Sequence, residues 1–317
     1  MELNVAQTGC FGSKPLESGP AHQRQCGNCP IAPHHLPRMD RYAVIGHPIG
    51  HSKSPAIHSA FAAATGQHLS YEAIEAPLGA GQFVATVERF RTQGGRGVNV
   101  TLPFKPEACA YATDLAESAR CAGAANALKF EGDRCLAENF DGSGLVRDLS
   151  HNLGLRLAGR TVLLLGAGGA SRGAILPLLR AKPAQLWVLN RSADKAEALV
   201  REFLALGADG SVLHGGGFAE LAQSVRFDLV LNATSASLSA EALPLPARAF
   251  KPEGLAYDMV YGKGLTPFLR QAQQAGVRQL ADGVGMLVEQ AADAFAWWRG
   301  VRPDTADLIR RLSLPLS

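Results

Sequence analysis

Residues 161–171, TVLLLGAGGAS, join a short apolar run to a glycine-rich turn and then to a helical pattern, and this stretch decides the fold of the chain. The glycines let the backbone approach a pyrophosphate, whose charge is favoured by free N–H groups at the start of the following helix. Ser171 stands where the strict pattern has its third Gly or Ala. The stretch therefore predicts a strand, turn and helix that bind a dinucleotide.

The next apolar run, residues 185–189, ends where a dinucleotide fold places the group that recognises the adenosine ribose. Asn190, Arg191 and Ser192 follow it, so no Asp or Glu is there to accept hydrogen bonds from the free 2′-hydroxyl of NAD. Arg191 can instead pair bidentately with a 2′-phosphate, Ser192 can donate from its hydroxyl, and Lys195 adds a second positive charge. These residues predict NADP(H); in the alternative, Arg191 and Lys195 are only a solvated helix start.

The length of 317 residues and the hydrophobic content of 47% are enough for about two globular domains. The formal charge of +3 is spread without a long Lys/Arg run, which argues against nucleic acid or an anionic membrane surface as a partner. No apolar stretch is long enough to cross a membrane, and the N-terminus lacks the apolar segment of a secretory signal. We therefore expect a cytoplasmic protein with a small-molecule substrate.

Residues 1–38 are rich in Gly, Pro, Ser, Gln and His and show no helix or strand periodicity, so they are predicted to be a disordered extension. The globular pattern begins at Met39, where we expect the functional unit to start. In the alternative, Cys26, Cys29 and the histidines at 34–35 ligate zinc. Because the segment lacks an apolar pattern that could fold around a metal, we expect no metal site.

From residue 39 onward, short β-branched runs alternate with longer amphipathic stretches, which is typical of an α/β protein with mainly parallel sheets. The predicted elements of a first unit are strands at 42–45, 69–75 and 97–100 and helices near 56–65 and 81–93. A helix over residues 148–157 is predicted to lead into a second unit, and a further helix begins near Met286.

Residues 46–55, GHPIGHSKSP, follow the first predicted strand and gather hydroxyls, imidazoles and an ammonium group at a helix start. Such a loop suits a small carboxylate, because the helix start offers free N–H groups and a favourable dipole. The alternative is a simple turn in which Ser54 caps the helix and Pro55 takes its first position.

Two ionisable residues lie in turns that follow strands of the first unit, where substrate chemistry is expected. Lys105 ends the segment 97–105, and Asp141 lies within residues 138–144. Taken alone, each is typical of an ordinary surface turn.

Nine segments occur in the order seen in shikimate dehydrogenases, and the chain resembles that family over residues 39–312. The segments are 46–58, 97–105, 123–126, 139–144, 166–170, 190–192, 232–235, 257–261 and 283–291.

The resemblance implies a two-domain enzyme that reduces 3-dehydroshikimate to shikimate with NADPH, as a monomer or a homodimer, in aromatic amino acid biosynthesis. Residues 39–147 together with 286–317 would form an α/β substrate-binding domain, and residues 148–285 a Rossmann-like NADP-binding domain.

The resemblance also implies roles for individual residues. Lys105 and Asp141 would form the catalytic pair. The substrate would be bound by Ser52, Ser54, Thr101, Lys105, Asn126, Asp141, Tyr261 and Gln290. NADP would be bound by Gly166, Ala167, Gly168, Gly169, Ala170, Asn190, Arg191, Ser192, Lys195, Thr234, Met259 and Gly283.

Three residues depart from the usual family pattern near the expected catalytic site. Ala127 and Phe140 stand where the family usually has Thr, and Glu138 stands where Asp is common. Phe140 either narrows the substrate pocket or turns into the core.

An alternative activity therefore stays open, namely an NADP-dependent dehydrogenase of quinate or a related ring acid. A non-catalytic NADP-binding relative is a third reading, against which the presence of both Lys105 and Asp141 argues. Arg172 and Arg299 are expected to be surface charges.

Overall fold

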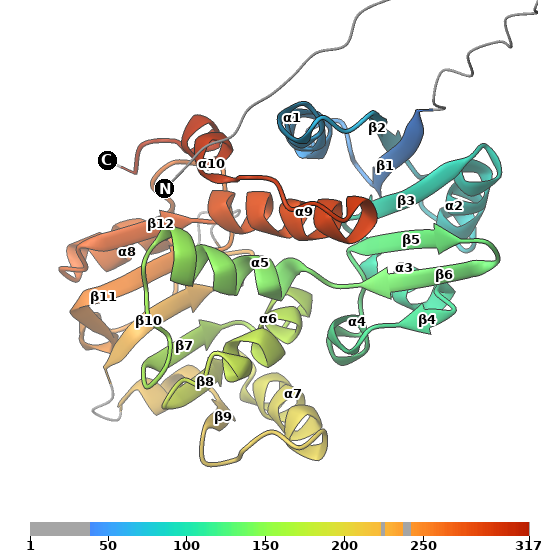
Figure 1. Ribbon diagram of the computed structural model, residues 1–317. Helices are drawn as coiled ribbons and strands as arrows, with labels where there is room; N and C mark the ends of the chain where they lie inside the picture. The colour runs from blue at the N-terminus through green and yellow to red at the C-terminus, as the bar shows by residue number, and fades with distance from the viewer. Residues whose placement is uncertain (1–38, 223–225, 237–241, 317) are drawn as a thin grey trace, which may run out of the picture. The chain divides into compact units, whose positions relative to one another are not determined.

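A computed structural model describes residues 39–222, 226–236 and 242–316 of the protein (Figure 1). The predictions made for residues 1–38, the extension and the zinc alternative, lie outside the described residues. The described residues belong to one compact unit by their contacts. The division into one domain of residues 39–147 plus 286–317 and another of 148–285 therefore stays a prediction.

The first sheet has six strands in the order β2-β1-β3-β5-β6-β4. Their bounds are β1 Asp40–Gly46, β2 Leu69–Glu75, β3 Gly95–Val100, β4 Asp114–Leu115, β5 Ala127–Glu131 and β6 Arg134–Glu138. β1 is parallel to β2 and β3, whereas β5 is antiparallel to both β3 and β6. β4 is parallel to β6, so this sheet is mainly parallel, as expected. The antiparallel pairs meet at β5, and the turn of the β5–β6 hairpin uses Gly132 with a φ of 58°.

The second sheet also has six strands, in the order β12-β11-β10-β7-β8-β9, and every neighbouring pair is parallel. Their bounds are β7 Thr161–Leu165, β8 Gln185–Leu189, β9 Leu213–Gly216, β10 Phe227–Asn232, β11 Phe250–Asp258 and β12 Gln279–Asp282. In β7, Val162 and Leu164 face one apolar cluster while Leu163 and Leu165 face another. A strand buried on both faces needs a continuous apolar run, which is why residues 162–165 are all aliphatic.

Helices cover both sheets (Figure 1). Their bounds are α1 Ser54–Thr65, α2 Gln82–Thr92, α3 Lys105–Tyr111, α4 Glu117–Ala122, α5 Asp141–Arg147, α6 Gly169–Arg180, α7 Ala193–Ala205, α8 Pro267–Gln274, α9 Val284–Arg299 and α10 Ala306–Leu312. Shorter turns are the π turn η1 Asp148–Asn152 and the 3₁₀ turns η2 Phe218–Ala222 and η3 Ala247–Ala249. Among the described residues, no helix is both long enough and apolar enough to cross a membrane.

The helix predicted over residues 148–157 is wrong in its bounds. α5 begins earlier, at Asp141, and continues into η1, which ends at Asn152. Gly154 then takes a φ of 66°, a backbone conformation that a glycine adopts without strain and that leaves the helix. Asp141 consequently occupies the first turn of a helix, where its negative charge is stabilised by the dipole.

Polar side chains join α5 to α9, which lie side by side (Figure 1). Ser143 Oγ donates to Asp293 Oδ2 at 2.7 Å, and Arg147 Nε lies 3.1 Å from Glu289 Oε2. Glu289 is completely buried and also pairs with Arg302. Because a buried carboxylate is costly unless paired, these contacts fix one helix against the other.

The expectation that Arg172 and Arg299 are surface charges is wrong. The Arg172 guanidinium donates to the Cys121 carbonyl and pairs with Glu202. Arg299 donates to Gln67 Oε1 at 2.9 Å and pairs with the Asp40 carboxylate. The two arginines therefore lie between elements of the fold, which their charge alone could not indicate.

Candidate active site

The loop of residues 46–55 ends in a helix that begins at Ser54, with Lys53 at the N-cap position and no side-chain cap. The simple capped turn with Ser54 as the cap is therefore wrong. Ser52 Oγ instead accepts a hydrogen bond from the Ser54 backbone N–H at 3.3 Å. Pro55 is the second residue of the helix and not, as that alternative expected, the first. That the loop binds a carboxylate stays a prediction.

Beneath this loop, Tyr71 and His58 form a buried aromatic pair. Their rings stack with centroids 4.2 Å apart and an interplanar angle of 5°. Tyr71 donates from its hydroxyl to Asn99 Oδ1 at 2.6 Å. Burial lowers the pKa of His58 to about 3, so its ring is neutral. Among the described residues, no group of three His, Cys, Asp or Glu side chains could hold a metal ion.

Lys105 and Asp141 come together although they lie on different elements. Lys105 is the first residue of α3, and Asp141 is the first residue of α5. The distance from Lys105 Nζ to Asp141 Oδ2 is 2.6 Å, and both side chains are about one-fifth exposed. An ammonium group that is held by a carboxylate yet open to solvent can reach a small molecule.

Asn126 connects this pair to α9. Its Nδ2 donates to Asp141 Oδ1 at 2.9 Å and to Gln290 Oε1 at 3.1 Å. Its Oδ1 accepts from the Phe140 backbone N–H at 2.9 Å. Asn126 is buried, its Nδ2 donates twice within the protein, and its Oδ1 can accept one further hydrogen bond. Four residues predicted to bind the substrate, Lys105, Asn126, Asp141 and Gln290, therefore lie in one hydrogen-bonded cluster.

Two further predicted substrate ligands flank the cluster. A Cβ placed on Gly46 would lie 2.4 Å from Thr101 Cγ2, so Thr101 is beside the start of the 46–55 loop. Tyr261 follows β11 of the second sheet and is 41% exposed. Burial, and after it the charge of Asp141, raises the pKa of the Tyr261 hydroxyl. Tyr261 therefore lies within electrostatic reach of Asp141.

Asn139, to which the sequence analysis gave no role, forms a hydrogen bond with the backbone of Asp141. Its Oδ1 accepts from the Asp141 backbone N–H at 3.1 Å, while its Nδ2 donates to the Ala124 carbonyl at 2.9 Å. The signal was present, because an Asn two residues before an acidic helix start is typical of an Asx turn. Asn99, which receives the Tyr71 hydrogen bond, had no comparable signal.

Phe140 turns toward aromatic side chains of the core. Its ring meets Trp297 edge-on, with centroids 5.8 Å apart and an interplanar angle of 69°. Ala127 is completely buried in the same cluster, together with Tyr42 and Trp298. The two departures from the usual Thr residues therefore share one cluster.

We expect Phe140→Thr to lower the free energy of unfolding by about 1–2 kcal/mol, because it removes a half-buried aromatic contact with Trp297. Phe140→Leu keeps the apolar packing and should lose less. Urea unfolding of both variants measures the difference. An unchanged midpoint for Phe140→Thr would mean that the ring contributes nothing through Trp297.

On the cofactor side, the glycine-rich turn lies at the carboxyl end of β7. Gly166 has a φ of 106°, and its N–H donates to the Leu189 carbonyl at 2.8 Å. Added Cβ atoms on Gly168 and Gly169 would meet no atom within 4 Å, so the backbone here is open to a ligand. Ser171 is completely buried, and its small side chain fits where the third Gly or Ala was expected.

The residues expected at the adenosine ribose lie at the end of β8 and the start of α7. Asn190 Nδ2 donates to the Ser192 carbonyl at 3.1 Å. Arg191, Ser192 and Lys195 are exposed, and Ser192 has no side-chain cap contact to α7. Ala167 and Ala170, which belong to the turn on the neighbouring strand β7, lie at the same sheet edge.

The remaining predicted cofactor residues follow β10, β11 and β12. Thr234 Oγ1 donates to Asn232 Oδ1 at 2.7 Å, and the Met259 N–H donates to the Asn232 carbonyl at 3.0 Å. A Cβ on Gly283 would lie 2.3 Å from the Met259 carbonyl oxygen, so only glycine fits there. Carboxyl ends of parallel strands thus bring all these residues to one edge of the second sheet.

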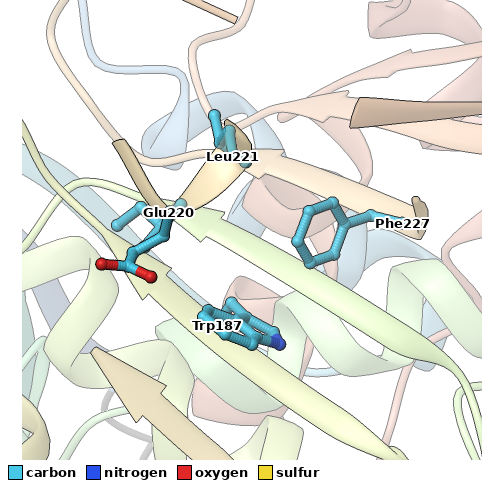
Figure 2. Close-up of a pocket in the computed structure, with 5 residues that line it drawn as sticks. Trp187, Glu220, Leu221 and Phe227 are labelled. Carbon is cyan, nitrogen blue, oxygen red and sulfur yellow. The ribbon is translucent and has the colours of Figure 1, made fainter. Parts of the chain in front are cut away.

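A separate small hollow on the second sheet does not belong to this site. Figure 2 shows its lining by Trp187, Glu220, Leu221 and Phe227. It leaves no room for a water molecule, so it is a packing gap.

Family models match three parts of the chain. The shikimate dehydrogenase substrate binding domain matches residues 44–128, and the shikimate / quinate 5-dehydrogenase model matches residues 148–239. The shikimate 5′-dehydrogenase C-terminal domain matches residues 283–312.

Relatives and solved structures agree with these matches. The chain is 56% identical to the shikimate dehydrogenase (NADP(+)) of Dechloromonas aromatica over 87% of its own length and 98% of the relative. The crystal structure of an Ael1 enzyme from Pseudomonas putida is 54% identical, with a TM-score of 0.82 over 88% of this chain and 100% of that one. The shikimate 5-dehydrogenase of Thermus thermophilus, in complex with NADP(H) and shikimate, is 35% identical, with a TM-score of 0.74 over 86% of this chain and 100% of that one.

These matches confirm the resemblance and the two-sheet α/β fold that were inferred from the sequence. With a substrate-domain match, a dehydrogenase match and relatives that are more than half identical over the aligned residues, the chain belongs to the shikimate dehydrogenase family.

Proposed function

We propose that the protein catalyses the NADPH-dependent, reversible reduction of 3-dehydroshikimate to shikimate. The observation that carries the proposal is the contact of 2.6 Å between Lys105 Nζ and Asp141 Oδ2, joined to Asn126 and Gln290 by hydrogen bonds. A proton donor, a carboxylate and two amides in one hydrogen-bonded cluster suit a ring that carries a ketone and several hydroxyls.

The residues at the edge of the second sheet suit NADPH. The open backbone at Gly168 and Gly169 precedes α6, whose N-terminus favours the pyrophosphate, and Arg191 with Lys195 suits the 2′-phosphate. When bound, NADPH supplies the hydride that reduces the ring ketone.

As the ketone becomes an alcohol, negative charge grows on its oxygen and a proton must arrive there. Lys105 Nζ donates that proton and takes one up again from solvent. Asp141 holds the ammonium group and accepts a hydrogen bond from the neighbouring ring hydroxyl, which fixes the ketone in place. In the oxidising direction, Lys105 accepts the proton from the substrate hydroxyl.

The remaining substrate contacts divide between the carboxylate and the ring. Ser52 and Ser54 donate to the substrate carboxylate at the start of α1. Thr101, Asn126 and Gln290 bind ring hydroxyls, and Tyr261 closes the site from the second sheet. These assignments rest on the family pattern of the sequence, and for Asn126 and Gln290 also on their hydrogen bonds in the cluster with Asp141.

The alternative substrate quinate is not favoured, because the relatives that share more than half of their residues with the chain are named shikimate dehydrogenase (NADP(+)). The proposal includes a cytoplasmic location, a role in aromatic amino acid biosynthesis and a monomeric or homodimeric state. It also includes the division into a substrate-binding domain and an NADP-binding domain.

The test is a comparison of initial rates with shikimate or quinate and with NADP or NAD at equal concentrations. We expect shikimate with NADP to be the preferred combination, by about tenfold or more over each alternative. Faster turnover of quinate would assign the protein to the alternative activity, and preference for NAD would refute the role of Arg191.

A further inference from the structure

The catalytic Asp141 stands at the start of a short helix whose two glycines touch other helices. α5 reads Asp-Gly-Ser-Gly from residue 141, and glycine is a poor helix former. Two glycines in a helix of seven residues therefore need a reason in the packing.

Gly144 touches α9. A Cβ on Gly144 would lie 2.7 Å from Gln290 N, 2.8 Å from Gln290 Cβ and 3.0 Å from Gln290 Cα. These atoms belong to the helix backbone or are attached directly to it, so no side-chain rotation could make room. An alanine would have to push α9 away from α5.

Gly142 touches α6. A Cβ on Gly142 would lie 2.2 Å from the Gly173 carbonyl oxygen and 2.7 Å from Pro177 Cγ. The obstacle is again backbone, on the helix that begins with the glycine-rich turn at Gly169. An alanine at position 142 would therefore have to push α5 away from α6.

The two contacts lie on different flanks of α5. Residues two apart on an α-helix point roughly 200° apart, since each residue turns the helix by roughly 100°. Figure 1 shows α5 between α9 and α6, which agrees with these contacts.

We propose that Gly142 and Gly144 are positioning residues, which independently set the spacing of Asp141 from the cofactor helix α6 and from the Gln290 side chain. The Gly144 contact keeps Gln290 within 3.1 Å of Asn126, which in turn holds Asp141. The Gly142 contact keeps the catalytic pair at a fixed distance from the turn at residues 166–169. This proposal rests on the proposed function, because it relates the spacing from Gln290 to the binding of shikimate and the spacing from α6 to the binding of NADP.

The test is steady-state kinetics of Gly144→Ala and Gly142→Ala. For Gly144→Ala we expect the KM for shikimate to rise about tenfold, as for the loss of one substrate hydrogen bond, with kcat and the KM for NADP within about threefold. For Gly142→Ala we expect kcat to fall about tenfold or more, with the KM for shikimate within about threefold, because the reacting groups are misplaced while the substrate ligands stay together.

Gly210→Ala is the control, in a turn after α7 that lies outside the proposed contacts. A Cβ there would lie 3.6 Å from Leu204 Cδ2, which is ordinary contact, so its kinetic constants should stay within about twofold of the parent. A double variant separates positioning from general damage. If Gly144 acts through Gln290, adding Gly144→Ala to Gln290→Ala should raise the KM for shikimate by no more than about twofold.

Ser143→Ala is the variant to use if neither glycine variant folds. It only removes a hydroxyl group, so it cannot create a steric clash between the helices. It deletes the hydrogen bond to Asp293 beside the Gly144 contact, and we expect a two- to threefold higher KM for shikimate. The proposal would be overturned by an unchanged KM for shikimate in Gly144→Ala, or by effects of Gly144→Ala and Gln290→Ala that simply add. It would also be overturned if each glycine variant changed kcat and the KM for shikimate to the same extent. A parent enzyme that fails to oxidise shikimate would instead overturn the proposed function.

Discussion

Lys105→Ala should lower kcat by about a thousandfold, while the KM for shikimate changes by less than about tenfold. In the proposed reaction, Nζ supplies the proton but makes only one of several contacts to the bound ring. Its neighbour Asp141 would keep its hydrogen bond from Asn126 and remain in place. The loss corresponds to about 4 kcal/mol of transition-state stabilisation, and initial rates at saturating NADP and shikimate measure it.

Lys129→Ala is the matched control for this variant. Lys129 also forms a close ion pair, with Glu131 at 2.7 Å, but it lies on β5 outside the cluster. Its removal should leave kcat within about twofold, since exposed ion pairs contribute little. If Lys105→Ala kept its kcat within about threefold of the parent, which is less than 1 kcal/mol, the proton donor would have to be another group.

Arg191→Ala should lower kcat/KM for NADP by about 10- to 100-fold and leave kcat/KM for NAD nearly unchanged. A hydrogen-bonded pair between a guanidinium and a phosphate contributes about 1.5–3 kcal/mol of binding free energy. NAD has no 2′-phosphate and makes no such pair, so its binding should not change. The measurement is the ratio of the two kcat/KM values for parent and variant.

Arg201→Ala provides the control on the same helix. Arg201 is an exposed arginine of α7 that pairs with Glu197 one helical turn away, so its removal should not change the ratio. The reading of Arg191 as a solvated helix start predicts the same result for both variants. Equal losses with NADP and NAD would contradict either reading, because they would place Arg191 at a part that both cofactors share.

In the second sheet, two neighbouring strands, β7 and β8, could be predicted from the sequence. Their apolar runs, 162–165 and 186–189, have no helical period, and the glycines after the first run identify the turn. The other four strands of this sheet were not predicted. In the first sheet the hairpin of β5 and β6 was missed. Each of the two strands has only five residues, and charged residues stand among the apolar ones, so neither gives a clear strand pattern.

The catalytic cluster could be assigned only through the family pattern. Lys105 and Asp141 are 36 positions apart, and Asn126 and Gln290 are 164 positions apart, so no local period relates them. The start of α5 was missed because Asp-Gly-Ser-Gly has the composition of a turn, whereas close contacts with α6 and α9 hold it as a helix. Tertiary packing here outweighs local propensity. The direction of the Phe140 ring depended in the same way on Trp297, which is far away in sequence.

The pairing of Asn126 with Gln290 has a consequence for how the enzyme matures. Residues 57 and 61 of α1 pack against residues 288 and 295 of α9, so the packing of α1 depends on a helix near the end of the chain. A nascent chain on the ribosome cannot complete this packing before α9 has emerged, although the strands from β7 to β12 have already been synthesised. Translation that stops before Val284 therefore yields polypeptide without a finished catalytic centre, and activity during synthesis should rise only with the last helices.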